Sequence, residues 1–486
     1  MICHPSRDEF MALAKSYPLV PVWTKVLADR ETPVSAFEKL VGADPGFLLE
    51  SVEGGENWAR WSFIGWDPLF TLTSREGQVD SQQQISSGDP LGALEELVSR
   101  VRAADLPGLP PLHSGLVGYL GYDTVRYIEH LPNRPLDDRR LPEMSWQAVG
   151  SLAAFDRVSQ SLTLVRNVLV GDDLEADYAA ALVELERATS RLGHSRPYRA
   201  LPFDQGRQAS TNHSSTMSRA EFEAAVRSAK ESIVAGDAFQ IVVSQRLAMS
   251  FDGDPFMVYR WLRVVNPSPY LFFYRTPEIA VAGSSPELMT RVREGQVFSR
   301  PIAGTRPRGE SPDRDLALEE ELRADPKERA EHVMLVDLAR NDLGRVCEFG
   351  TVAVDELMVV ERYSHVMHLV SGISGKLRAG VGPVDVLRAT FPHGTVSGAP
   401  KVAAMEIIDR LEPVARGPYA GALGYIDFSG NVDTAICLRT VVISGGQAWV
   451  QAGAGIVADS DPATEYEETM SKAAAGLAAV EAAANA

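Results

Sequence analysis

The sequence lacks the features that mark several large classes of protein. Its 486 residues include only 3 cysteines, Cys3, Cys347 and Cys437, which are too few and too scattered for a disulfide framework or a zinc site built on paired cysteines. No segment approaches the roughly 18 consecutive apolar residues of a membrane-spanning helix. The stretch from Met1 to Lys15 lacks the basic region and apolar core of a secretory signal. We therefore expect a cytoplasmic protein with no membrane partner.

Positive charge is also in short supply. Lysine and arginine number 47 against 65 aspartate and glutamate residues, which gives a formal net charge of −18. Nucleic acids and anionic membranes are not attracted to so acidic a surface, so neither is expected as a partner. A buried site that binds a small anion with the help of a cation is still compatible with this charge.

Internal repeats and a regular alternation of strands with helices are missing as well. Short β-rich runs are instead separated by loops or hairpins. The strand-like runs include Phe47–Ser51, Ser62–Gly65, Ser161–Val170 and Phe239–Ser244, and the helical segments include Tyr178–Leu192 and Arg219–Ala235. This pattern predicts an α+β fold with large, mainly antiparallel sheets.

A polar segment divides the chain. Residues 194–217 contain two prolines, several turn-forming residues and no sustained hydrophobic period, which is typical of a surface connection. We therefore predict an N-terminal domain over residues 1–205 and a C-terminal domain over residues 206–486. Most of the residues with recognisable chemistry lie in the second.

Glutamates recur in pairs on two predicted helices of the C-terminal half. Asp325-Pro326 and Asp461-Pro462 are typical helix starts. Paired carboxylates on one helix face suit a hard cation such as Mg²⁺, but each pair alone is also typical of a solvated face. The spacing leaves open whether the two helices meet. The pairs are Glu328 with Glu331, and Glu465 with Glu468, which Lys472 follows one turn later.

Two glycine-rich segments look like nucleotide-binding loops but have the wrong context. Only 31 residues follow Gly455 of Gly453-Ala454-Gly455, too few for the rest of a dinucleotide-binding unit. We expect a glycine turn there, which either brings its N–H groups close to a carboxylate or is purely structural. Gly394–Lys401 lacks Walker A spacing and is predicted to begin the helix Lys401–Leu411, as an anion-facing end or a plain cap.

Histidines and nucleophilic side chains are further candidates for catalytic groups. Four of the nine histidines, His332, His365, His368 and His393, fall in one stretch. Because no HExxH pattern is present, zinc is not favoured, and each histidine is either structural or an acid or base near neutral pH. The chain has no Gly-x-Ser-x-Gly elbow and no cysteine in a glycine-flanked turn, so it offers no nucleophile for hydrolysing glutamine.

An ordered set of longer motifs carries more information than any of these features alone. The motifs are FQIVVSQR (239–246), NPSPY (266–270), GSSPE (283–287), PIAGTR (301–306), EHVMLVDLARND (331–342), GTVSGAPK (394–401) and QAGAG (451–455), and the N-terminal half adds LLES (48–51) and GLVGYLGY (115–122). This set resembles the chorismate-utilising enzymes, in particular their anthranilate-forming members. The resemblance implies large antiparallel sheets packed as a sandwich with helices outside.

Two positions discriminate among the activities of that family. The isochorismate and salicylate synthases carry a lysine base where this chain has Gln240, and an amide cannot deprotonate water. The 4-amino-4-deoxychorismate synthases typically carry a lysine nucleophile where this chain has Ala303. The resemblance therefore implies ammonia attack at C2 of chorismate, giving anthranilate and pyruvate. An enzyme that stops at 2-amino-2-deoxyisochorismate, an aminodeoxychorismate synthase and an inactive tryptophan-sensing subunit remain alternatives.

The resemblance also implies roles for individual residues. Glu331 and Glu468 would hold Mg²⁺, with Glu328 and Glu465 adjacent. Glu287 would protonate the departing C4 hydroxyl of chorismate, His368 would assist the loss of pyruvate, and Thr395 and Lys472 would complete the catalytic pocket. Substrate binding would fall to Gln240, Gly304, Thr305, Tyr419, Arg439 and the main chain of Gly453, Ala454 and Gly455.

Two further ligands or partners follow from the same resemblance. Since no glutaminase domain fits within this length, a separate glutamine amidotransferase subunit is expected to deliver the ammonia. L-Tryptophan is expected as a feedback inhibitor. Its predicted site joins Leu49, Glu50 and Ser51 of the N-terminal half to Asn266, Pro269, Tyr270 and Leu271 of the C-terminal half.

Overall fold

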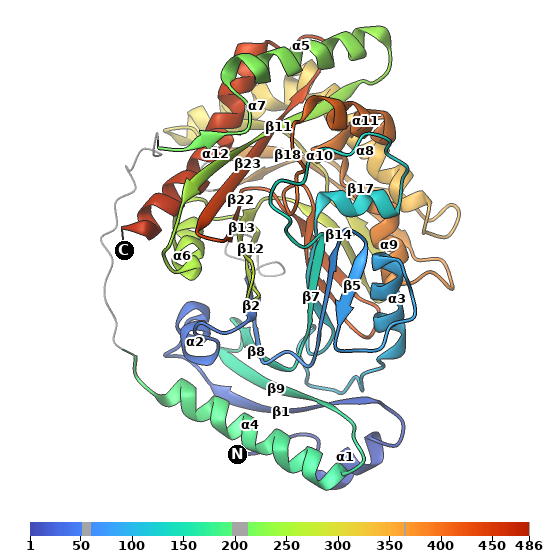
Figure 1. Ribbon diagram of the computed structural model, residues 1–486, viewed down its shortest axis with the longest axis vertical. Coiled ribbons are helices and arrows are strands. Elements are labelled where there is room, and N and C mark those ends of the chain that lie inside the picture. Colours follow the sequence, from blue (N-terminus) through green and yellow to red (C-terminus); the bar gives the residue numbers. More distant parts are fainter. Residues whose placement is uncertain (51–59, 197–211, 364–365, 486) are drawn as a thin grey trace.

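Two large β-sheets dominate the computed structural model, which describes residues 1–50, 60–196, 212–363 and 366–485. The sheets face each other as a sandwich, and helices cover their outer sides (Figure 1). All the strand pairs described between named strands are antiparallel. The predicted α+β class with large antiparallel sheets is therefore confirmed.

The larger sheet has 12 strands within the described residues. Its spatial order is β1 (Leu19–Leu27), β9 (Ser161–Leu169), β8 (Ser151–Asp156), β3 (Trp61–Trp66), β2 (Gly46–Glu50), β12 (Tyr270–Arg275), β13 (Ala280–Ser285), β22 (Thr440–Ser444), β23 (Gln447–Ile456), β11 (Gln240–Ser250) and β10 (Ser214–Ser215), with β19 (Gly398–Ala399) paired to β11. The strand-like runs of the sequence correspond to β2, β3, β9 and the start of β11.

The smaller sheet has 11 strands within the same described ranges. Its order is β16 (Ile302–Pro307), β18 (Val366–Lys376), β15 (Gln296–Ser299), β14 (Leu288–Arg293), β21 (Val432–Ile436), β20 (Ala422–Ile426), β6 (Leu116–Leu120), β7 (Met144–Ala148), β4 (Thr71–Arg75) and β5 (Gln78–Ser81), with β17 (Ala353–Arg362) paired to β18.

Helices pack on the outer faces of both sheets. They are α1 (Arg7–Leu13), α2 (Pro33–Leu40), α3 (Pro90–Arg100), α4 (Leu174–Gly193), α5 (Arg219–Ala235), α6 (Pro255–Val265), α7 (Pro312–Ala324), α8 (Pro326–Gly344), α9 (Pro383–Thr390), α10 (Gly394–Ser397), α11 (Lys401–Leu411) and α12 (Pro462–Ala484), with a 3₁₀ helix at Tyr122–Tyr127. None of the described helices is both long and apolar enough to cross a membrane.

Hydrophobic side chains fill the space between the sheets and the space under the helices. Phe47, Phe63 and Tyr119 belong to the core between the two sheets. Leu48, which neighbours Phe47 on β2, points the other way, into the core under α2, α4 and α6. This alternation is the period of two of a β-strand, and it buries both faces of the sheet. Each fully buried side chain of this size contributes about 1.5–3 kcal/mol.

The two glutamate-bearing helices begin where the sequence predicts. Asp325 caps α8 by accepting a hydrogen bond from the N–H of Lys327 at 2.9 Å. Asp461 caps α12 by accepting one from the N–H of Thr464 at 2.9 Å. In both helices a proline occupies the first turn, where its missing N–H costs nothing. These caps fix the position of the first two turns of each helix.

Both sheets take strands from both halves of the chain. In the larger sheet, β2 pairs with β12; in the smaller sheet, β6 pairs with β20. The predicted boundary at residue 205 falls in the range 197–211, outside the described residues. The division into two domains stays a prediction, and the halves share a common sandwich.

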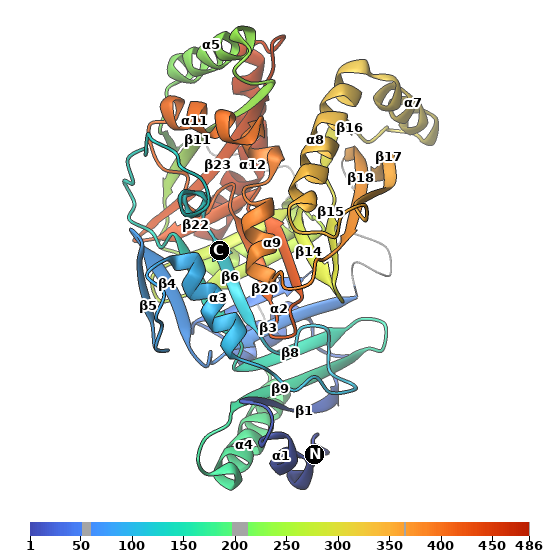
Figure 2. The ribbon, with the colours of Figure 1, turned by 90° about the vertical axis from the view of Figure 1, so that its right-hand side faces the viewer.

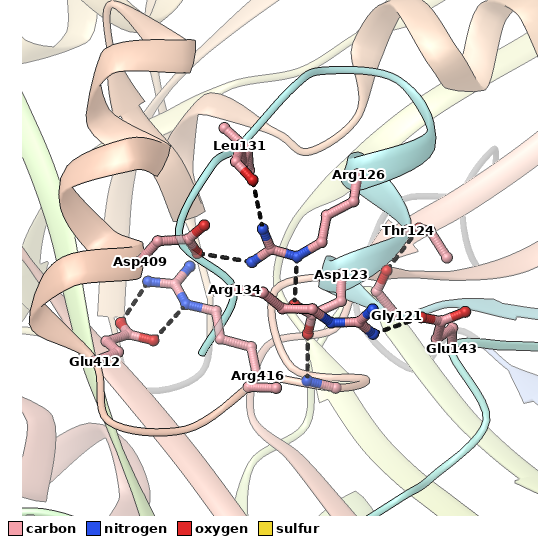
Figure 3. Close-up of polar contacts among 12 residues, drawn as sticks. Gly121, Asp123, Thr124, Arg126, Leu131, Arg134, Glu143, Asp409, Glu412 and Arg416 are labelled. Atoms are coloured by element: carbon pink, nitrogen blue, oxygen red, sulfur yellow. Dashed lines mark hydrogen bonds and ion pairs between the residues drawn. The ribbon is translucent and has the colours of Figure 1, made fainter. Parts of the chain in front are cut away.

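One ion pair joins the N-terminal half to α11, and a second, fully buried pair lies at the end of α11 itself (Figure 3). Arg126 donates to Asp409 of α11 at 2.9 Å and to Asp123 at 3.3 Å. Arg416, which follows α11, donates to both carboxylate oxygens of Glu412, at 2.9 and 2.6 Å. Because these charges are withdrawn from water, each depends on its partner, and loss of one partner is expected to be costly.

Candidate active site

One cavity collects most of the predicted site residues. It has a volume of about 610 Å³, and α8, α10, α12, β11, β16, β18 and β23 contribute to its walls. Figure 2 shows α8 with β16–β18 on one side of the upper half of the molecule, and α5, α11 and α12 on the other. Of the residues predicted to catalyse, bind substrate or hold metal, those lining the cavity are Gln240, Gly304, Thr305, Glu328, Glu331, His368, Thr395, Arg439, Gly455, Glu465, Glu468 and Lys472.

The two pairs of glutamates meet in this cavity, which their spacing in the sequence left open. One pair lies on the first two turns of α8 and the other on the first two turns of α12. All four side chains line the same space. Glu465 is buried and Glu328 and Glu331 are half-buried, whereas Glu468 is still exposed at the edge of the cavity.

Two of these carboxylates, those of Glu331 and Glu465, form no ion pair with a lysine or arginine within the described residues. Burial raises the pKa of Glu331, even though Gln240 Nε2 donates a hydrogen bond to its Oε1 at 2.7 Å. Burial also raises the pKa of Glu465. A buried carboxylate whose ionised form is disfavoured would be stabilised by a cation.

The donor set fits a cation that takes few protein ligands. No group of three or more histidine, cysteine, aspartate or glutamate side chains in the described ranges is arranged to hold a metal ion by itself. Glutamate oxygens from α8 and α12 can supply part of a coordination shell, with the rest left to water or a bound anion. Mg²⁺ favours this kind of site, because it prefers oxygen ligands and retains several waters.

The other two glutamates have cationic neighbours. Arg306 Nη1 is 3.1 Å from Glu328 Oε1, and Lys472 Nζ forms an ion pair with Glu468. Lys472 Nζ also donates to the main-chain oxygen of Gly453 at 3.1 Å. The lysine therefore links α12 to β23, the strand on which this helix packs.

Arg439 is a cation without a protein partner in the part of the chain that the structure describes. Its guanidinium lines the cavity and makes no hydrogen bond or ion pair there. Burial lowers the pKa of Arg439, and nearby Tyr419 and Glu468 offset this effect only in part. Its backbone has a φ of 47°, a conformation that costs a non-glycine residue on the order of 1–3 kcal/mol. A strained, desolvated and unpaired arginine is prepared to bind an anion.

A buried acid lies just behind the cavity wall. Glu287 is 2% exposed and accepts a hydrogen bond from Thr395 Oγ1 at 2.8 Å and from the N–H of Ile302 at 3.3 Å. Burial raises the pKa of Glu287 to about 8, and these two hydrogen bonds offset only part of the effect. The carboxyl group is therefore protonated at neutral pH, as a general acid requires. Thr395, which lines the cavity, stands between Glu287 and the open space.

His368 is held as a neutral ring. Its Nδ1 lies 2.9 Å from Thr305 Oγ1 and 3.3 Å from the main-chain oxygen of Gly304. Burial lowers the pKa of His368 to about 4. The carbonyl neighbour assigns the proton to Nδ1, so Nε2 is the atom able to accept a proton.

The expected glycine turn at residues 453–455 is wrong. Gly453, Ala454 and Gly455 lie within β23, where they pair with β11. The pairing of β23 with β22 ends at Val450, so among the described strands only β11 pairs with this part of β23. A Cβ at Gly455 would lie 2.7 Å from Gln240 Nε2 and 3.8 Å from Glu331 Oε1. Glycine is needed here because a side chain would fill the space beside these groups, and not because of a turn.

Four predicted residues lie behind the walls and do not line the cavity: Glu287, Tyr419, Gly453 and Ala454. Tyr419 is 5% exposed, and burial raises its pKa to about 12. Its ring centre is 5.8 Å from the guanidinium carbon of Arg416. The Glu412–Arg416 ion pair thus supports this side of the site.

A second cavity of about 360 Å³ lies between the sheets and holds most of the predicted inhibitor residues. Leu49, Glu50, Pro269, Tyr270 and Leu271 line it. The Glu50 carboxylate accepts hydrogen bonds from Tyr259 Oη, at 2.6 Å, and from Arg263 of α6. Asn266 lines the first cavity instead, and Ser51 lies outside the described residues.

Sequence reasoning missed several residues of both sites. In the second cavity, β20 and β21 contribute Leu423, Gly424, Tyr425 and Asp433; no motif marked these strands. Near the acid, His393 Nδ1 lies 3.6 Å from Glu287 Oε1. The signal for His393 was its place directly before GTVSGAPK, next to a predicted helix start.

Comparison with known proteins shows to which family the chain belongs. Residues 45–478 match the family described as chorismate binding enzyme. The chain is similar to anthranilate synthase component 1 of Acetivibrio thermocellus, with 45% identity, 98% of each chain being covered. It is similar to the same component of Pseudomonas aeruginosa, with 46% identity and 98% coverage of each. The component of Mycobacterium tuberculosis is 47% identical, over 98% of this chain and 96% of the relative.

Solved structures agree on the fold. Anthranilate synthase component I from Streptococcus pneumoniae superposes with a TM-score of 0.79 at 35% identity, covering 93% of this chain and 98% of that one. The isochorismate synthase MenF of Escherichia coli has a TM-score of 0.69 at 20% identity, covering 98% of each. The second likeness concerns the fold alone.

Proposed function

We propose that the large cavity of this chain converts chorismate and ammonia to anthranilate and pyruvate. The premise is that the chain belongs to the chorismate-binding enzymes and aligns almost end to end with anthranilate synthase component 1 proteins. The observation that supports this most directly is an arginine without a protein partner among the described residues, Arg439, in one cavity with four glutamates. Chorismate is a dianion, and such a cavity offers a cationic fork for one carboxylate and a metal-binding face for the other.

The glutamates of α8 and α12 are the proposed metal-binding residues. Glu331 and Glu468 would hold Mg²⁺, with Glu328 and Glu465 adjacent. A bound Mg²⁺ would supply positive charge for the ring carboxylate of the substrate. Arg439 would bind the other carboxylate, and Lys472, which is paired with Glu468, would hold that glutamate in place.

The first chemical step needs a proton donor. Ammonia forms a bond to C2 of the ring while the bond from C4 to its hydroxyl breaks, and the departing oxygen takes up a proton to leave as water. Glu287, protonated at neutral pH, would supply this proton through the Thr395 hydroxyl that separates it from the cavity. A positioned acid of this kind typically contributes about 10²–10⁴ in rate.

The second step needs a proton acceptor. The C2 hydrogen is lost as a proton, the bond from C3 to the enolpyruvyl oxygen breaks, and the ring becomes aromatic. The expelled enolpyruvate takes up a proton and becomes pyruvate. His368 would assist because its neutral ring has Nε2 free to accept a proton.

Two side chains that are not basic bear on which nucleophile adds to chorismate. Gln240 donates its amide hydrogen to Glu331 and cannot activate water. Ala303 offers no amine for a covalent intermediate. Both observations favour free ammonia as the nucleophile.

Purified protein tests this proposal. With chorismate, Mg²⁺ and ammonium salt we expect fluorescent anthranilate to accumulate. Salicylate or 4-amino-4-deoxychorismate as the product would contradict the proposal. Ammonia-dependent loss of chorismate without pyruvate would instead identify an enzyme that stops at the amino intermediate.

A separate glutamine amidotransferase subunit is the proposed ammonia source. Burial raises the pKa of the thiols of Cys3, Cys347 and Cys437, so none of them is an activated nucleophile. Glutamine should therefore fail to replace ammonium for the isolated chain and should succeed once the amidotransferase subunit is added. Efficient use of glutamine by the isolated chain would overturn this expectation.

The second cavity is the proposed site for L-tryptophan as a feedback inhibitor. The rings of Trp61, Phe63, Tyr270 and Tyr425 line it, and the ion pair of Arg291 with Asp433 stands at its wall. Aromatic walls beside opposite charges suit an amino acid with a large flat side chain. Isothermal titration should detect tryptophan binding, and tryptophan should slow anthranilate formation; binding without inhibition would contradict the regulatory role.

A further inference from the structure

His393 is a buried titratable residue that the proposed mechanism does not use. It is 5% exposed and caps α10, where its Nδ1 accepts a hydrogen bond from the N–H of Thr395 at 3.3 Å. The same Nδ1 lies 3.1 Å from Thr395 Oγ1 and 3.6 Å from Glu287 Oε1. The imidazole therefore touches both the proposed acid and the hydroxyl that connects it to the cavity.

The Thr395 hydroxyl has one hydrogen and two acceptors within reach. Because Nδ1 accepts from a main-chain N–H, it carries a lone pair and no hydrogen. When Glu287 is ionised, the hydroxyl donates to its Oε1, 2.8 Å away. When Glu287 is protonated, the carboxyl hydrogen can be donated to Thr395 Oγ1, and the hydroxyl hydrogen turns to His393 Nδ1. In this second order His393 Nδ1 accepts from both the N–H and the hydroxyl of Thr395, which share its single lone pair.

The charge state of His393 matters as much as its position. Burial, together with a smaller effect of the nearby Lys401 of α11, lowers the pKa of His393 to about 3. Lys401 is itself paired with Asp342 of α8 at 2.7 Å, and among the described residues Lys401 and Glu287 are the titratable groups next to the imidazole. A charged imidazole next to Glu287 would stabilise the carboxylate, whereas a neutral one accepts a hydrogen bond and leaves the acid protonated.

We propose that His393 is a positioning residue that keeps the proton on Glu287 by serving as the final acceptor in the chain Glu287–Thr395–His393. The inference rests on the proposed role of Glu287 as the acid. Without the acceptor, the Thr395 hydroxyl has only Glu287 to bond, which favours the carboxylate and lowers the acid's pKa. His393 thus sets the upper end of the pH range in which the enzyme works.

The test compares H393L and H393A with H393N, whose amide oxygen can replace Nδ1 as an acceptor. For each variant, kcat/KM for chorismate with ammonium is divided by the wild-type value at the same pH, which cancels the ionisation of ammonium. We expect the Leu and Ala ratios to be constant at low pH and to fall about 3- to 10-fold as the pH rises past the acid's pKa, the size of one hydrogen bond. The Asn ratio should stay flat.

Each outcome decides the question. Flat ratios for both Leu and Ala would overturn the inference and leave His393 a structural cap, and an Asn profile that falls like that of Leu would overturn it too. Thermal unfolding shows whether each variant folds. If H393L does not fold, H393A is used in its place. If the wild-type protein makes no anthranilate from ammonium, the proposed function fails first, which is distinct from an active enzyme with flat ratios.

Discussion

Two arginines with different partners, the buried Arg416 and the half-buried Arg439 of the cavity wall, should respond to the same substitution in opposite ways. Arg439 lines the cavity without a hydrogen bond or ion pair in the described part of the chain, and burial lowers its pKa. Arg416 donates to both oxygens of Glu412 and also to the main-chain oxygens of Val396 and Val242, each at 2.7 Å. We compare R439M with R416M, since methionine keeps the apolar length of the side chain and removes the charge.

The expected magnitudes follow from these contacts. R439M loses two charge-assisted hydrogen bonds to a substrate carboxylate, each about 1.5–3 kcal/mol, so kcat/KM should fall by roughly 10² or more. Its free energy of unfolding should stay the same or rise, because a desolvated cation without a partner has been removed. R416M leaves Glu412 buried without its cation and should lower the free energy of unfolding by about 3–5 kcal/mol.

Anthranilate fluorescence gives the kinetics, and thermal or urea unfolding gives the stability. The reasoning would be refuted if R439M destabilised the protein as much as R416M does. It would also be refuted if R439M kept kcat/KM within about threefold of the wild type, since one charge-assisted hydrogen bond already corresponds to more than that.

Three further predictions concern the acid, the metal ion and the inhibitor. With free ammonia held constant, kcat/KM should fall as the pH rises through about 8, because Glu287 must be protonated; E287Q should lose this limb and about 10²–10⁴ in kcat. Because the pKa of Glu287 is 4.5 in the unfolded chain and about 8 in the folded protein, its bound proton contributes fully to stability below pH 4.5. This contribution is lost as the pH rises toward about 8, so the unfolding temperature of the wild type relative to E287Q should decline between these two pH values. E331Q should raise the Mg²⁺ concentration needed for half-maximal rate by at least about tenfold, whereas the control E320Q on α7, outside the cavity, should not; equal curves would contradict the metal assignment. L49A should raise the tryptophan concentration for half-inhibition by about 5- to 30-fold, the loss of roughly 1–2 kcal/mol of contacts, and more than L48A, which faces the helix-side core; equal effects would argue against the second cavity.

Local signals predicted the elements well because each depends on neighbouring residues. Asp325 and Asp461, each followed by proline, mark the starts of α8 and α12 through hydrogen bonds that span only a few residues. The α+β class also followed from the pattern of short strands and loops. The pairing of β2 with β12 and of β6 with β20 joins segments far apart in the chain, and no spacing rule predicts such contacts.

The site shows the same limit. The sequence could place Glu328 with Glu331 on one face, but only the tertiary fold brings residues of α8 and α12 to the same cavity. The predicted glycine turn at 453–455 was wrong, because these residues are extended within β23. What matters at Gly455 is the missing side chain, which leaves room beside Gln240 and Glu331, and not the conformational freedom of the backbone. The pKa of Glu287 could not be predicted either, since it depends on burial behind Thr395.

The most direct measurement of the central claim is the product balance of the isolated chain supplied with chorismate, Mg²⁺ and isotopically labelled ammonium. The account predicts labelled anthranilate and pyruvate in equal amounts, formed at the rate at which chorismate disappears, with no formation of either from glutamine alone. Loss of chorismate without pyruvate, or an aromatic product without the nitrogen label, would contradict it.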